Sequence, residues 1–153
     1  MMFKTHIMFG LLAALCALSY FQPADSIFFI FFVLFGSALP DIDHPNSFIG
    51  KKTKIIAWLF EHRGFWHSLF ALIPISFAFS FVLAKINLYA LFIGYASHLI
   101  IDAATKEGIM LFHPLSKFRI RGFIHTGGLM EYVLLAVIAA ADLYFVNSSV
   151  NFP

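Results

Sequence analysis

The chain has 153 residues, of which 61% are hydrophobic and only 12% are charged, and its mean hydropathy is +0.87. A soluble domain carries roughly 25% charged residues, so this composition excludes a soluble globular protein and predicts an integral membrane protein. The formal net charge is +2. We expect the basic residues to set membrane topology, with no nucleic-acid partner. Residues 1–153 are short enough to form a single domain.

Five apolar segments follow one another along the chain, at about residues 5–21, 26–39, 65–84, 87–104 and 129–146. Crossing the hydrocarbon takes roughly 20 helical residues, so the sequence predicts an all-α integral membrane protein, a bundle of about five transmembrane helices. Residues 54–60 and 109–112 are expected to form short interfacial helices. Residues 7–19 resemble the apolar part of a signal peptide, but bulky Leu15 argues against a cleavage site. We therefore expect an uncleaved first span.

The distribution of lysine and arginine predicts the orientation. With a cytoplasmic N-terminus and five spans, only Lys85 lies outside, and every other basic residue lies inside. The inside set is Lys4, Lys51, Lys52, Lys54, Arg63, Lys106, Lys117, Arg119 and Arg121. Such a bias is the positive-inside pattern. It predicts a multi-pass protein of the cytoplasmic (inner) membrane with both long loops, 40–64 and 105–128, in the cytoplasm.

The histidines and acids gather at the predicted cytoplasmic ends of the spans. They are His6 at the start of the first span, Asp41, Asp43 and His44 after the second, His62, Arg63 and His67 at the entrance to the third, His98 and Asp102 at the end of the fourth, and His125 and Glu131 at the entrance to the fifth. Separate helices that converge at one end of a bundle are a common way to assemble a site.

Two of these groups have a spacing that favours metal binding. His98 and Asp102 are four residues apart and share one helix face, although a hydrogen bond within the helix is the simpler interpretation. Asp41 and Asp43 flank one residue, and two such carboxylates repel each other unless a cation or proton lies between them. The alternative for this pair is a solvated loop or a helix cap. Ionisable residues in apolar spans are costly and usually functional.

A site rich in histidine and aspartate suits divalent metals. With only one cysteine, Cys16, a thiolate site is excluded, so Zn²⁺ is favoured, with Mn²⁺ and Fe as alternatives. The predicted ligands are His6, Asp41, Asp43, His62, His67, His98 and Asp102. These exceed the three or four ligands that one ion takes, so we expect two or more metal ions.

Several blocks of the sequence resemble one family across nearly the whole chain. The blocks are His6, the segment Leu39-Pro40-Asp41-Ile42-Asp43-His44-Pro45, His62-Arg63-Gly64 with His67-Ser68, Gly94-Tyr95 with His98 and Asp102, and Thr126-Gly127-Gly128 with Glu131. They are similar to the YdjM-like inner-membrane proteins, a family described as metal-dependent hydrolases. The resemblance implies a hydrolase without naming its substrate. The His-x-x-x-Asp helix also resembles those of the all-α zinc phospholipase C and P1 nuclease group, which implies phosphoester chemistry.

The remaining polar residues are candidates for catalysis. The guanidinium of Arg63 is able to hold a phosphate through two hydrogen bonds. Glu131 is expected either to cap the last helix or to act in the site, and the two interpretations are level. His44 and His125 are candidate acid catalysts or partners of the ligands, with ordinary loop histidines as the alternative.

Together these features predict a metal-dependent hydrolase at the cytoplasmic membrane face. Its partners are membrane lipids, and its expected substrate is a phosphoester of a lipid or an amphiphile. The alternatives are a membrane metal-ion transporter or sensor, and an interaction protein in which metal serves structure only. A carrier is expected to show broken helices or repeats around a midplane site, whereas these residues lie at one end of the bundle.

Overall fold

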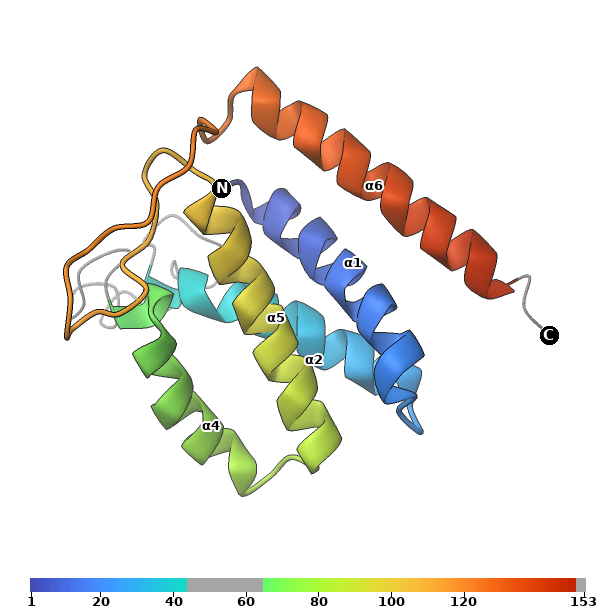
Figure 1. Cartoon of the computed structure of the whole chain (residues 1–153). Helices are drawn as coiled ribbons and strands as arrows, with labels where there is room; N and C mark the ends of the chain where they lie inside the picture. Colours follow the sequence, from blue (N-terminus) through green and yellow to red (C-terminus); the bar gives the residue numbers. More distant parts are fainter. Residues whose placement is uncertain (44–64, 151–153) are drawn as a thin grey trace.

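The computed structural model describes residues 1–43 and 65–150, and it shows an all-α membrane protein (Figure 1). The α-helices are α1 (Phe3–Phe21), α2 (Ser26–Ala38), α4 (Leu72–Ser80), α5 (Lys85–Ala103) and α6 (Leu129–Val150). Short 3-10 turns are η1 (Leu39–Asp43), η3 (Phe65–His67) and η4 (Leu69–Ala71). The predicted interfacial helix at 54–60 lies outside the described residues.

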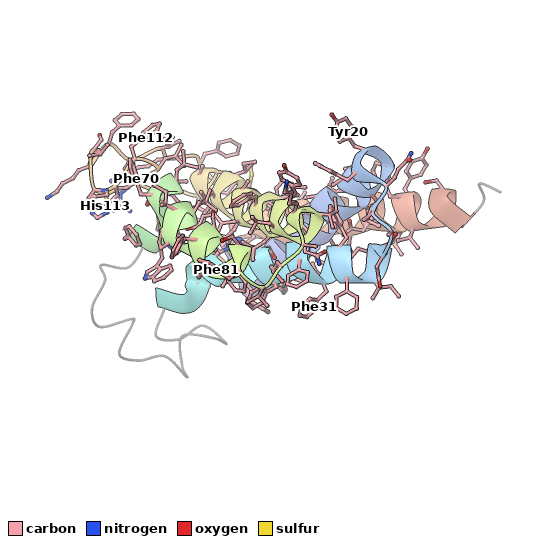
Figure 2. The ribbon with its side chains drawn as sticks, turned by 90° about the horizontal axis from the view of Figure 1, so that it is seen from below. Tyr20, Phe31, Phe70, Phe81, Phe112 and His113 are labelled. Atoms are coloured by element: carbon pink, nitrogen blue, oxygen red, sulfur yellow. The ribbon has the colours of Figure 1, made fainter. Side chains whose placement is uncertain are left out.

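Three described helices are long and apolar enough to cross a membrane: Phe3–Phe21, Lys85–Ala103 and Leu129–Ser148. Two shorter apolar segments, Ser26–Asp41 and Leu69–Ser80, pack beside them. Large apolar side chains cover the outside of the bundle, among them Tyr20, Phe31 and Phe81 (Figure 2). Such a surface is suited to lipid rather than to water.

The predicted span 65–84 is not one continuous helix. It consists of η3, η4 and α4, and its α-helical part is only Leu72–Ser80. Pro74 explains the late start, because proline has no N–H to donate and is tolerated in the first turn of a helix but not in its interior. Before the helix, a backbone hydrogen bond is made to another part of the chain: Leu69 N–H donates to the carbonyl of Leu111, at 3.0 Å.

Helices α2 and α5 form the closest packing in the described bundle. At Gly36 an added Cβ would lie 2.3 Å from the carbonyl oxygen of Leu91, and at Gly94 one would lie 1.8 Å from that of Val33. No residue larger than glycine fits either position without moving the backbones apart. This contact brings the end of α2 against the last turns of α5, where His98 and Asp102 lie.

The connection between α5 and α6 folds back on itself as a hairpin. Ile109 and Ile120 exchange both backbone hydrogen bonds, each at 2.9 Å, and Thr105 pairs with Ile124. The prediction of a helix at 109–112 is therefore wrong. Ile109 and Met110 pack inward, since both are buried, and pairing with Ile120 satisfies the backbone of Ile109.

Candidate metal centre

His98 and Asp102 form the middle of the site. Both side chains are buried, and they lie one turn apart on α5, with His98 Nε2 3.6 Å from Asp102 Oδ2. The spacing of four residues predicted this shared face, and the structure confirms it.

The ring of His98 is oriented by a backbone group that the sequence analysis did not identify. His98 Nδ1 lies 2.7 Å from the carbonyl oxygen of Ser37 at the end of α2. A carbonyl only accepts hydrogen bonds, so Nδ1 carries the proton and Nε2 presents its lone pair to the site. Histidines that bind metals are commonly held this way through their second nitrogen.

Two more side chains meet this pair, and together the four form what we call the inner donor set: Asp41 Oδ1, His67 Nε2, His98 Nε2 and Asp102 Oδ2. The His67 and His98 nitrogens are 3.3 Å apart, and His67 Nε2 is 3.6 Å from Asp102 Oδ2. Asp41 Oδ1 lies 4.0 Å from His67 Nε2 and 3.9 Å from His98 Nε2. Three elements, η1, η3 and α5, thus bring these four side chains together.

Tyr95 holds the turn that carries His67. Its hydroxyl donates to the carbonyl of Trp66 at 2.5 Å, and it lies 3.3 Å from the carbonyl of Ser68. Tyr95 is fully buried and is three residues before His98 on α5. One face of α5 therefore supplies two donors and positions a third.

His6 approaches Asp102 from the other side. His6 Nε2 lies 3.3 Å from Asp102 Oδ1, and its ring stacks on that of His98 with centroids 3.7 Å apart. Within the described part of the chain, neither ring nitrogen of this buried histidine makes a hydrogen bond. The α-ammonium group of Met1 lies 2.5 Å from the same Asp102 oxygen, so positive charge already faces it.

The start of α1 is fixed by Glu131 in the first turn of α6. The buried Glu131 carboxylate accepts hydrogen bonds from Met2 N–H at 2.6 Å, from the Thr5 hydroxyl at 2.8 Å and from Gly127 N–H at 2.6 Å. These bonds match the helix-cap interpretation, because they satisfy amides at the beginnings of two helices. Since Thr5 precedes His6, Glu131 also fixes where His6 enters the site.

The other predicted site residues lie elsewhere or outside the described residues. His125 is exposed on the hairpin side, with Nε2 3.0 Å from Lys106 Nζ, and it is not brought to the inner donor set. His44, His62 and Arg63, and the side chain of Asp43, lie outside what the structure describes. Their predicted roles therefore stay predictions.

The donor set fits a small divalent cation. Two groups of metal-binding side chains converge within the described residues, His6 with His98 and Asp102, and Asp41 with His67 and His98. Ligands at about 2.0–2.1 Å around tetrahedral Zn²⁺ lie roughly 3.3 Å apart, close to the observed 3.3–4.0 Å. The buried ring nitrogens of His6 make no hydrogen bond within the described residues, and such a nitrogen is suited to bind a cation.

Comparison with known proteins identifies the family. A sequence profile of the YdjM inner membrane protein family matches residues 1–151. The chain belongs to the YdjM inner membrane protein family. It is 36% identical over 148 residues to the uncharacterized protein YvsG of Bacillus subtilis (strain 168), which covers 93% of this chain and 92% of that protein. No solved structure matches the chain.

A shorter match links the chain to the protein after which the YdjM family is named. The inner membrane protein YdjM of Escherichia coli (strain K12) is 38% identical over 86 residues, covering 50% of this chain and 44% of that protein. The YdjM protein of Shigella flexneri matches to the same extent. Family membership and the apolar helices agree that this chain is a membrane protein.

Proposed function

We propose that this protein is a metal-dependent hydrolase that acts at the cytoplasmic face of the membrane, on a phosphoester of a lipid or an amphiphile. One observation carries the proposal: five distances between donors of Asp41, His67, His98 and Asp102 are 3.3–4.0 Å, at one end of an apolar bundle. Burying so many ionisable groups together is costly unless a cation compensates them.

Two ions are supported by the way Asp102 divides its oxygens. Oδ2 faces His67 and His98, whereas Oδ1 faces His6 and the α-ammonium group of Met1, which a second ion would have to replace beside Oδ1. A carboxylate with metal-binding side chains near each of its oxygens is able to hold two cations, as in two-metal hydrolytic sites. Zn²⁺ suits these nitrogen and oxygen donors best, with Mn²⁺ and Fe as alternatives.

In this proposal the metal and the protein contribute different parts of the hydrolysis reaction. When bound, a divalent metal supplies a nucleophilic water at neutral pH and polarises a phosphoryl oxygen. The chain fixes its donors in advance: Ser37 orients His98, and Tyr95 holds the turn of His67. Arg63, which is outside the described residues, is proposed to hold the phosphoryl oxygens with its planar fork of donors. His44, which is outside the described residues, remains a candidate for proton transfer to the leaving group.

The site is proposed to face the cytoplasm because of the distribution of basic residues. Among the basic residues that the structure describes, Lys85 at the beginning of α5 is the one at the opposite end from the donor set. Reporter fusions test this orientation directly: a fusion after residue 128 should report the cytoplasm, and a fusion at the C-terminus should report the outside. A cytoplasmic C-terminus would contradict the five-span topology.

The hydrolase proposal is tested on full-length protein purified in detergent. Metal content is measured first, and phospholipid and nucleotide esters are then screened with and without a chelator. We expect metal-dependent ester cleavage. Arg63→Lys should keep the metal but lose turnover by about tenfold to a thousandfold, the range for removing one oriented donor, whereas Lys52→Ala should change neither. If no ester is cleaved while metal ions cross sealed vesicles, the protein is a carrier instead.

A further inference from the structure

The hairpin between α5 and α6 has a buried root and an exposed apolar tip. At the root, Ile109 and Met110 are 1% and 5% exposed, and Ile109 is paired with Ile120. Beyond the root the apolar side chains point outward: Phe112 is 48%, Leu115 80% and Phe118 69% exposed. A loop in water seldom presents several large apolar side chains in a row. The tip therefore has an apolar environment that the described chain does not provide.

The tip begins beside the segment that leads into α4. Leu69 N–H donates to the carbonyl of Leu111. Phe112 lines an apolar hollow of about 250 Å³ together with Leu69, Phe70 and Ile73. Figure 2 shows Phe70, Phe112 and His113 grouped at one end of the molecule. Because Ile73 belongs to the outer surface of an apolar helix and is 65% exposed, Phe112 shares the depth of lipid-facing residues.

The connection that carries this apolar tip has an excess of basic residues. Residues 105–128 contain four basic side chains, Lys106, Lys117, Arg119 and Arg121, and one acid, Glu107. Glu107 is engaged within the connection, since its carboxylate accepts from the Thr126 hydroxyl at 2.8 Å and its carbonyl from Arg119 Nη1 at 3.2 Å. The excess positive charge is thus placed beside apolar side chains at the membrane surface, where phospholipid phosphates lie.

We propose that the tip, residues 111–119, inserts among the head groups of the surrounding membrane, and that Lys117, Arg119 and Arg121 bind an anionic phospholipid there. Phe112, Leu115 and Phe118 enter the boundary of the hydrocarbon, and the cations pair with the head-group phosphates. This binding site is separate from the donor set and does not depend on hydrolysis.

Native mass spectrometry of the full chain tests the proposal. Protein in mixed micelles is offered equal amounts of phosphatidylglycerol and phosphatidylcholine with identical acyl chains, and the ratio of the two bound lipids is measured. We expect an excess of phosphatidylglycerol. In the triple variant Lys117→Gln, Arg119→Gln, Arg121→Gln the excess should fall by roughly fivefold per neutralised cation. Lys85→Gln, which removes the basic residue at the opposite end, is the matched control and should keep the full excess.

A second measurement covers the case in which the triple variant does not fold. In the parent protein, raising the salt from 0.1 to about 1 M shortens the Debye length to roughly 3 Å, so the phosphatidylglycerol excess should shrink without any mutation. Leu115→Ser together with Phe118→Ser should also reduce total bound lipid. Equal binding of both lipids by the parent protein, or a triple variant that folds and retains the excess, overturns the proposal.

Discussion

Two buried aspartates lie in the long helices of this protein, and their surroundings differ completely. Asp102 at the end of α5 has His6, His67 and His98 around its two oxygens. Asp142 in α6 is 4% exposed, and neither of its oxygens has a hydrogen-bond partner among the described residues. Both carboxylates are equally unusual in an apolar span. Burial of an acid is therefore not sufficient to identify the site.

The difference arises from which helices meet at each aspartate. The end of α5 is reached by α1, by the end of α2 and by the turns before α4. Helix α6 lies alongside α1 (Figure 1) and has no comparable packing against the other described helices. Several elements converging on one carboxylate can each supply a donor, whereas a single neighbouring helix cannot surround it.

The largest effect is expected from Asp102→Asn. An amide cannot replace a charged carboxylate that has metal-binding side chains on both sides. The affinity for Zn²⁺ should therefore fall on the order of a thousandfold, about 4 kcal/mol, and turnover should fall with it. Metal stoichiometry after dialysis and a Co²⁺ titration measure this loss. The control is Asp142→Asn, the same substitution in the other aspartate, which should keep the metal. Full metal content in Asp102→Asn would exclude Asp102 as a ligand.

Gly94→Ala should produce the next largest change. The new methyl group meets the backbone of α2 rather than a movable side chain, so the two helices must separate, at about 3 kcal/mol of stability. Thermal unfolding in detergent measures the loss. At Gly10 an added Cβ would meet the side chain of Ser37 instead, so Gly10→Ala is the matched control with a smaller expected loss. Equal losses would show that the α2–α5 contact is not the tightest in the bundle.

Asp142→Leu should stabilise the protein. It removes a buried carboxylate without hydrogen bonds, whose burial costs about 1–3 kcal/mol. The unfolding midpoint in detergent should rise, with metal content and turnover unchanged. If turnover is lost while the metal remains, Asp142 serves the function directly, and the contrast between the two aspartates would need another explanation.

The sequence predicts the parts of this site that depend on local spacing. The shared face of His98 and Asp102 follows from the helical repeat, and the apolar segments predict an all-α membrane protein. The break before α4 was also readable in principle from Pro74. The pairing of Ile109 with Ile120 was not, because it depends on contacts between residues distant in the chain. Composition alone favoured an interfacial helix there.

Contacts made by backbone groups are the hardest to predict from the sequence. The Ser37 carbonyl reaches His98 because Gly36 and Gly94 let α2 and α5 approach closely. No side-chain pattern reports such a bond, since every residue has a carbonyl. Glu131 is intermediate: its position in the first turn left a cap and a role in the site as equal interpretations, and its bonds to Met2 and Thr5 depend on how α1 packs against α6.

The smallest effect is expected from Ser37→Ala, because Ser37 contacts His98 through its backbone and not through its side chain. The bond to His98 Nδ1 uses the backbone carbonyl of Ser37, which alanine retains. The Ser37 hydroxyl only donates to the carbonyl of Leu34 within α2, at 2.8 Å, so its removal should change stability by less than about 1 kcal/mol. Metal affinity should stay within about threefold of the parent value, below the 10- to 100-fold loss typical when the partner of a metal-binding histidine is removed. Zn²⁺ competition with a chromogenic chelator measures the difference, with His98→Ala as the control that removes the ring itself. If Ser37→Ala loses as much Zn²⁺ affinity as His98→Ala, then the hydroxyl of Ser37, not its carbonyl, orients His98. The close contact of α2 and α5 would then matter less for the site than the Ser37 side chain.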